Sequence, residues 1–320
     1  RKAMWDKIAE SLPEEKEPAF AEFKVMIARL ETFGNETGIN GVLVYLDNQL
    51  CLSERQVASL RELFLSNWNS CFNNSTGMMA FNGMNSSEGV IELVSKEDFE
   101  KILSPRQFEA LESLDRYANF WQASGIRLND VDVEHVKAFC NEVMEFKIAE
   151  YQELVGITEQ QMKTLTTASK RVRSQMVIQF KLVAAMETED VTLAEPVILK
   201  CLREKTWRMA LEKVFDEEQL QKIESREAAR QELAADQSVN QLVLPFVRSL
   251  GLSYEQCVKL SDVLKNHLDG THTSYFSATM SVPEVSDEEY QEILNDEQWQ
   301  LFKPGLHASR AGLVDNDDFG

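Results

Sequence analysis

The sequence predicts an all-α fold, an array of about three repeated helical modules with capped antiparallel helices. Three observations predict it. Glycine (13) and proline (7) are scarce, apolar residues recur three and four positions apart, and six helix-start strings occur in three ordered pairs. β-Rich folds and long loops consume glycine and proline, so their scarcity favours helices joined by short connections.

Helical spacing is clearest in two stretches, AFAEFKVMIARLETF at 19–33 and VKAFCNEVMEFKIAEYQELV at 136–155. Apolar residues three and four apart lie on one face of an α-helix, so both stretches are predicted to be amphipathic helices. The stretch LVLPFVRSL at 242–250 leads into the third module, and Pro245 is expected near a helix start or kink because proline cannot donate a backbone hydrogen bond.

The first set of helix-start strings begins at 50, 155 and 250 and reads LCLSERQVASL, VGITEQQMKTL and LGLSYEQCVKL. Each has Ser or Thr followed three residues later by Gln, the pattern of a capping box that satisfies free N–H groups at a helix N-terminus. Apolar residues flank each box at the two positions of a hydrophobic staple. Gly156 and Gly251 stand where a preceding helix needs a left-handed residue, and Cys51 takes that place in the first string. The predicted capping pairs are Ser53 with Gln56, Thr158 with Gln161, and Ser253 with Gln256.

A second string follows each of the first: ILSPRQFEAL at 102–111, VFDEEQLQKI at 214–223 and ILNDEQWQLF at 293–302. In two copies a further cap precedes it, at Ser95 and Ser286. Six boxes in three ordered pairs indicate internal repetition. The predicted capping pairs of this set are Ser104 with Gln107, Asp216 with Gln219, and Asn295 with Gln298.

The boxes divide the chain into five predicted segments. These are an N-terminal helical segment at 1–37, helical modules at 38–125, 126–235 and 236–308, and an acidic tail at 309–320. The loops at 67–89 and 267–283 vary most between modules, so they either carry recognition or serve as connectors.

The net charge of −20 disfavours nucleic acid and anionic membrane surfaces, and no apolar stretch is long enough to cross a bilayer. This negative charge suits a basic protein partner or divalent cations. The five cysteines form no CxxC pair and are expected to be small apolar core residues. The chain opens at Arg1 without an initiator Met, which fits removal of an upstream segment such as a signal peptide.

The L-S/T-x-x-Q boxes resemble the bacterial LTxxQ-motif family, the Spy/CpxP-like helical proteins, and also larger planctomycete envelope proteins with repeated boxes. The matching strings are LCLSERQ, GITEQQ and LGLSYEQ, with LSPRQ, FDEEQ and LNDEQ as partners. The resemblance implies a helical, exported protein that binds other proteins in the periplasm or cell envelope. Three modules and a strongly acidic composition distinguish this chain from the small chaperones, which have one hairpin and a basic concave face.

No catalytic motif occurs: GxSxG, GxxxxGK[ST], GxGxxG and HExxH are all missing. The most ligand-like cluster is His267, Asp269 and His272 in the string HLDGTH, for which a polar loop is the alternative to a metal site. The prediction is therefore no catalytic residue, no cofactor and no dedicated metal site.

The functional prediction is a non-enzymatic interaction or structural protein that scaffolds a protein assembly of the cell envelope, with other proteins or further copies of itself as partners. One alternative is a periplasmic chaperone or a stress- or metal-sensing module of the Spy/CpxP type. Another is a metal-responsive protein or enzyme that uses the loop between His267 and His272. A cytoplasmic location is the alternative to the envelope.

Overall fold

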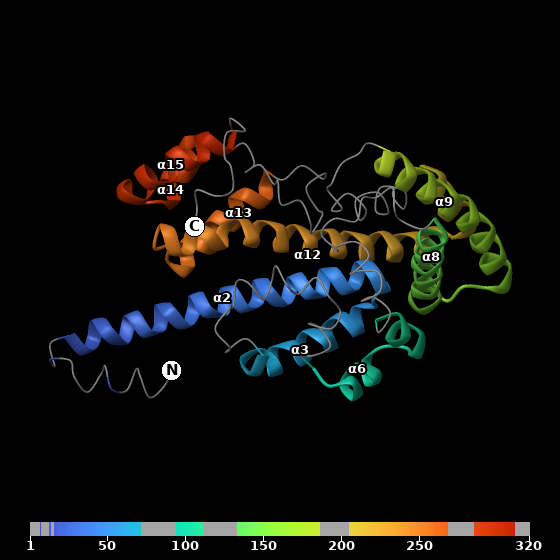
Figure 1. The fold of residues 1–320 in the computed structure, drawn as a ribbon, viewed down its shortest axis with the longest axis horizontal. Helices are drawn as coiled ribbons and strands as arrows, with labels where there is room; N and C mark the ends of the chain where they lie inside the picture. Colours follow the sequence, from blue (N-terminus) through green and yellow to red (C-terminus); the bar gives the residue numbers. More distant parts are fainter. Residues whose placement is uncertain are drawn as a thin grey trace. The chain divides into compact units, whose positions relative to one another are not determined.

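The computed structural model describes residues 16–71, 94–111, 133–185, 205–267 and 285–310, together with Lys7 and Pro13. Over these residues the chain is α-helical, with no strand, as the sequence predicts (Figure 1). A short helix also covers 105–111. The other helices are α2 (Glu17–Leu50), α3 (Glu54–Cys71), α6 (Lys96–Ile102), α8 (Val133–Val155), α9 (Glu159–Ala185), α11 (Lys205–Val214), α12 (Glu217–Ser249), α13 (Tyr254–Asn266), α14 (Asp287–Ile293) and α15 (Asp296–Arg310).

Two compact units contain these helices. One comprises the described residues of 1–38, 235–272 and 279–320, and the other comprises those of 39–234. The unit boundaries after 38 and 234 lie within one residue of two predicted segment boundaries. The grouping is different, however: the predicted N-terminal segment shares a unit with the third module, and the first two modules share the other unit.

Both unit boundaries fall inside helices, because α2 and α12 continue through them without a break. Of the two expected positions for Pro245, a helix start or a kink, the helix start is excluded, because Pro245 lies inside α12, four residues before its end. Its missing N–H removes one backbone bond, a loss that a helix tolerates when packing holds its apolar face. The neighbouring Val243 is fully buried in the core of its unit.

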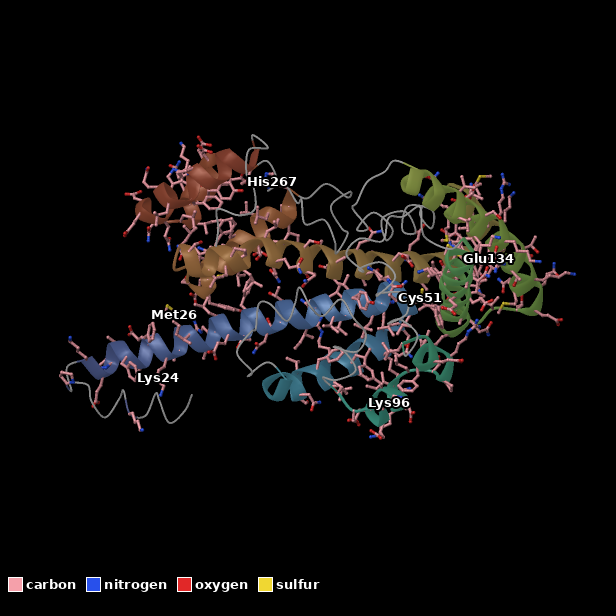
Figure 2. The ribbon with its side chains drawn as sticks, in the orientation of Figure 1. Lys24, Met26, Cys51, Lys96, Glu134 and His267 are labelled. Atoms are coloured by element: carbon pink, nitrogen blue, oxygen red, sulfur yellow. The ribbon has the colours of Figure 1, made fainter. Side chains whose placement is uncertain are left out.

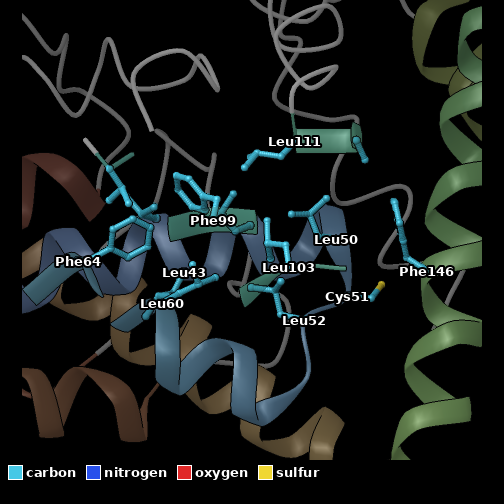
Figure 3. Close-up of a cluster of buried hydrophobic side chains, with 14 of the residues drawn as sticks. Leu43, Leu50, Cys51, Leu52, Leu60, Phe64, Phe99, Leu103, Leu111 and Phe146 are labelled. Carbon is cyan, nitrogen blue, oxygen red and sulfur yellow. The ribbon is translucent and has the colours of Figure 1, made fainter. Parts of the chain in front are cut away.

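The buried apolar side chains of the described residues form three clusters, and each contains one pair of boxes with the helix that precedes it. The first cluster surrounds Leu50, Leu52 and Leu103 (Figure 3). The second surrounds Tyr151 and Phe215, and the third surrounds Leu252, Tyr290 and Trp299. The staple residues of each box are members of their own cluster or pack against it. The apolar surface that each capping turn buries thus lies in the core of its own box pair.

Candidate functional site

The residues predicted to cap helices all lie at helix starts. Ser53, Thr158 and Ser253 immediately precede α3, α9 and α13. The backbone N–H of Gln56 donates to Ser53 Oγ at 3.4 Å, and the N–H of Ser53 donates back to Gln56 Oε1 at 2.9 Å. The other five boxes repeat this reciprocal bonding at Ser104–Gln107, Thr158–Gln161, Asp216–Gln219, Ser253–Gln256 and Asn295–Gln298.

The two boxes of each pair are also joined to each other through their glutamine amides. Gln56 Nε2 donates to the carbonyl of Ile102 at 3.1 Å and to Gln107 Oε1 at 2.7 Å. Gln107 Nε2 donates in return to the carbonyl of Leu50 at 3.0 Å. Each glutamine therefore caps the N-terminus of its own helix and the C-terminus of the helix before its partner. We call this arrangement the glutamine lock.

The same lock recurs in the other two pairs. Gln161 donates to the carbonyl of Val214 and Gln219 to that of Val155, at 2.8 and 3.2 Å. In the third pair, Gln256 donates to the carbonyl of Ile293 at 2.9 Å. Gln298 donates to the carbonyl of Leu250 at 3.1 Å. The lock explains why all six boxes carry Gln, since Glu completes a capping box equally well but has no amide to donate to the partner helix.

A buried ionic cluster lies where α2 ends, and sequence reasoning did not identify it. Arg230 donates to both carboxylate oxygens of Asp47 at 2.9 Å and to both oxygens of Glu150 at 2.6 and 3.0 Å. Arg226 donates to Asp47 Oδ2 at 2.9 Å. Such two-pronged guanidinium–carboxylate contacts are the strong form of the ion pair.

Lys147 and Glu227 complete the cluster. Lys147 Nζ donates to Glu150 at 3.1 Å and to Glu227, and Arg230 donates to Glu227 Oε1 at 3.0 Å. Three acids (Asp47, Glu150, Glu227) thus face three bases (Lys147, Arg226, Arg230), so the cluster is neutral as a whole. Asp47 is the one sequence signal of the cluster, because it directly follows the apolar run VLVYL at 42–46. Buried charges of that kind require partners.

Cys51 lies beside this cluster in an unusual backbone conformation. Its φ is +48°, whereas the other two positive-φ positions among the described residues are Gly156 and Gly251, at +67° and +60°. The left-handed region is costly for a residue with a Cβ, and it persists only where surrounding contacts hold it. Here the carbonyl of the next residue, Leu52, accepts hydrogen bonds from Arg226 at 2.7 Å and from Arg230 at 3.2 Å.

The environment shifts the pKa values of several groups in and around the cluster, and the shifts of Cys51, Glu227 and Lys147 each hold the group in one protonation state. Burial raises the pKa of the Cys51 thiol to about 12, so the thiol stays protonated. Burial opposes the charge of Glu227, but Lys147 and Arg230 outweigh it and lower the pKa of that carboxyl to about 2. Burial and Arg230 disfavour the ammonium of Lys147, yet Tyr151 and the two glutamates leave its pKa above its ordinary value.

Of the three candidate metal ligands, the structure describes His267. His267 ends α13, where its ring Nδ1 lies 3.0 Å from the carbonyl of Val263 and its Nε2 lies 3.6 Å from Glu289 (Figure 2). Asp269 and His272 lie outside the described residues, as do nearly all of both variable loops and the tail beyond 310. Across the described residues, no three or more His, Cys, Asp or Glu side chains are grouped to hold a metal ion.

Comparison of the chain with models of protein families, with characterised proteins and with solved structures gives no match. In the part of the chain that the structure describes, no helix combines the length and apolar character needed to cross a membrane.

Proposed function

We propose that this protein is a non-enzymatic helical scaffold that holds together a protein assembly of the cell envelope. The observation that carries the proposal is the glutamine lock, present in all three pairs of boxes. Each lock joins four helix ends through two side-chain amides, and Gln107 of the first lock and Gln298 of the third are buried. Such bonds fix the geometry of a frame and leave its outer surfaces available to partners.

The protonation states around the ionic cluster support the non-enzymatic part of the proposal. A nucleophilic cysteine needs a lowered pKa, and a general base needs a pKa near neutrality. The pKa of the Cys51 thiol is raised, that of Lys147 is raised and that of Glu227 is lowered. At pH 7 the thiol is therefore neutral, the amine is charged and the carboxyl is ionised, which are their resting states.

The proposal is tested by purifying the tagged protein from its native source after mild crosslinking and measuring what accompanies it. A scaffold should be recovered with a partner in fixed stoichiometry or as a defined assembly of its own copies. Light scattering after gel filtration measures the mass of that assembly. The variant Asp47→Ala, which disturbs the frame, should lose that partner. The variant Gln152→Ala changes an exposed position and should keep it. Recovery of a lone monomer contradicts the proposal.

A chaperone-like or stress-sensing role is the second candidate, and exposed apolar side chains on the first part of α2 favour it. Phe23 and Val25 are 43% and 53% exposed, and exposed apolar side chains are what a chaperone offers to an unfolded client. A chaperone should suppress the heat aggregation of a model client at equimolar ratio, and the double variant Phe23→Ser, Val25→Ser should weaken that effect. Unchanged client aggregation removes this candidate.

A further inference from the structure

The unit formed by residues 39–234 contains a cavity of about 370 Å³ beside the ionic cluster. It lies between the end of α2 and side chains of α8, α11 and α12. Its volume falls in the lower part of the range of small-molecule sites, roughly 300–1,000 Å³. Its size therefore suits a compact ligand.

Apolar and aromatic side chains form the walls of the cavity. Tyr151 and Trp207 line it and stack with their ring centroids 6.4 Å apart and their planes at 18°. Leu211, Leu220 and Ile223 supply the aliphatic surface. An aromatic or branched apolar body fits such walls, since burial of apolar surface is the main source of affinity in a site of this kind.

The cations of the cluster have little capacity left for an anionic ligand. Arg230 directs Nε, Nη1 and Nη2 to three carboxylates and to the carbonyl of Leu52. Lys147 is held by Glu150 and Glu227. An anion would have to displace a buried carboxylate from one of these bases, which leaves that carboxylate without its partner at high cost.

Carboxylates predominate among the more exposed lining residues. The side chains of Glu212, Glu224 and Glu227 are 54%, 70% and 38% exposed, against one cation, Arg208. Glu227 accepts both of its hydrogen bonds on Oε1, and no described residue donates to its Oε2. Over the whole lining, four acids (Asp47, Glu212, Glu224 and Glu227) face three bases (Lys147, Arg208 and Arg230). This excess of one negative charge favours a positively charged ligand group, and Glu227 Oε2 is an acceptor for an N–H donor.

We propose that this cavity binds a small organic cation, a primary ammonium group on an aromatic or branched apolar body. The body occupies the walls around Trp207, and the ammonium group donates to Glu227. The binding site is separate from the scaffold role, because it lies in one unit and uses no residue of the glutamine locks.

Three probes that share a phenyl ring test the charge preference by isothermal titration calorimetry: phenethylammonium, 2-phenylethanol and 3-phenylpropionate. The ammonium is expected to bind at least about tenfold more tightly than the alcohol, a difference of about 1.4 kcal/mol, and the carboxylate more weakly still. Equal or tighter binding of the alcohol or the carboxylate overturns the proposal. Absence of ammonium binding at about 10 mM overturns it as well, because a Kd above this value corresponds to less than about 3 kcal/mol of binding free energy.

Three variants locate the binding. Ala228 lines the cavity at an exposed position of α12, so Ala228→Trp should fill the space without disturbing the core and abolish binding. Glu227→Gln should weaken the ammonium about tenfold and leave the alcohol unchanged. Glu159→Gln, the same change at an exposed residue outside the cavity, should have no effect. Circular dichroism checks that each variant is folded, and unchanged binding to the Ala228→Trp variant overturns the assignment.

Discussion

The chain leaves a helix before a capping box at three equivalent turns, at Cys51 after α2, Gly156 after α8 and Gly251 after α12. All three residues have positive φ, and in all three a box glutamine donates to the carbonyl just before the turn. The turns differ four residues earlier, where the first has the buried Asp47 and the others have the exposed Gln152 and the half-buried Val247.

This difference shows that one turn geometry can be stabilised in two ways. Glycine adopts the left-handed conformation without a steric penalty, so the turns at Gly156 and Gly251 need no further support. The left-handed conformation of Cys51 costs free energy. The ionic cluster offsets this cost, because Arg226 and Arg230 donate hydrogen bonds to the carbonyl of Leu52. Cys51 also lines the cavity, whereas Gly156 and Gly251 do not.

The largest effect should come from removing the acid that distinguishes the first turn. Asp47→Ala leaves Arg226 and Arg230 buried with one carboxylate fewer, and breaking a buried pair from one side costs about 3–5 kcal/mol. The matched change Gln152→Ala should cost less than about 0.5 kcal/mol. Urea unfolding followed by circular dichroism measures both, and equal costs would mean that the cluster does not support the first turn.

The second effect tests what the three turns share. Gln256→Glu keeps the capping box but replaces the amide donor with a carboxylate oxygen facing Ile293 O and Gln298 Oε1. Loss of a partly buried donor of this kind should cost about 2–3 kcal/mol. The control is Glu289→Gln in the Ser286 box. Among the described residues, the Glu289 side chain contacts only its own turn and His267, so this change should stay within about 0.5 kcal/mol. An unchanged free energy of unfolding for Gln256→Glu would show that the lock does not stabilise the fold.

The third prediction concerns alkaline pH. The folded-state pKa of Cys51 is raised to about 12 from 9.0, so the unfolded chain loses this proton first and stability falls as pH rises above 9. Between pH 9 and 10.5 this lowers the unfolding free energy by about 2 kcal/mol. Cys51→Gly, which copies the other two turns, should remove this share of the decline. Identical pH profiles for both proteins would contradict the burial argument.

The smallest effects come from the turn residues themselves. Gly251→Ala should cost about 1 kcal/mol from backbone strain alone, because a Cβ there meets no atom within 4 Å. Cys51→Gly at pH 7 should change stability by less than about 1 kcal/mol, in the stabilising direction. The control is Gly34→Ala in α2, where a Cβ would lie 3.9 Å from Leu244, an ordinary contact, so stability should rise by about 0.5–1 kcal/mol. Thermal unfolding measures all three.

The six helix starts were predictable because capping is a local interaction, made by residues three apart in the sequence. Their pairing in sequence order was visible too, but the lock was not. It joins residues 42 to 58 positions apart, as in Gln256 with Gln298 and Gln161 with Gln219. Its one sequence indication is the use of Gln at the third position of all six boxes, where Glu can also complete the capping box.

The partners of Asp47 in the ionic cluster, and the cavity beside it, lay beyond sequence reasoning for a similar reason. Asp47, Glu150 and Arg230 come from three helices, and no spacing rule connects them. The grouping of the helices into two units was not predictable from the sequence either. Because α2 and α12 run through both unit boundaries, each helix packs in two units, and this change of packing partner leaves no trace in its local apolar pattern.

By itself, the sequence determined the helical class, the helix starts and the turns that need a left-handed residue, because these depend on backbone groups and side chains within a few positions of one another. Only the tertiary structure decided which helix end each glutamine amide reaches, and that Cys51 could take a conformation suited to glycine. Both depend on distant side chains that supply hydrogen bonds and charges to groups that water no longer reaches.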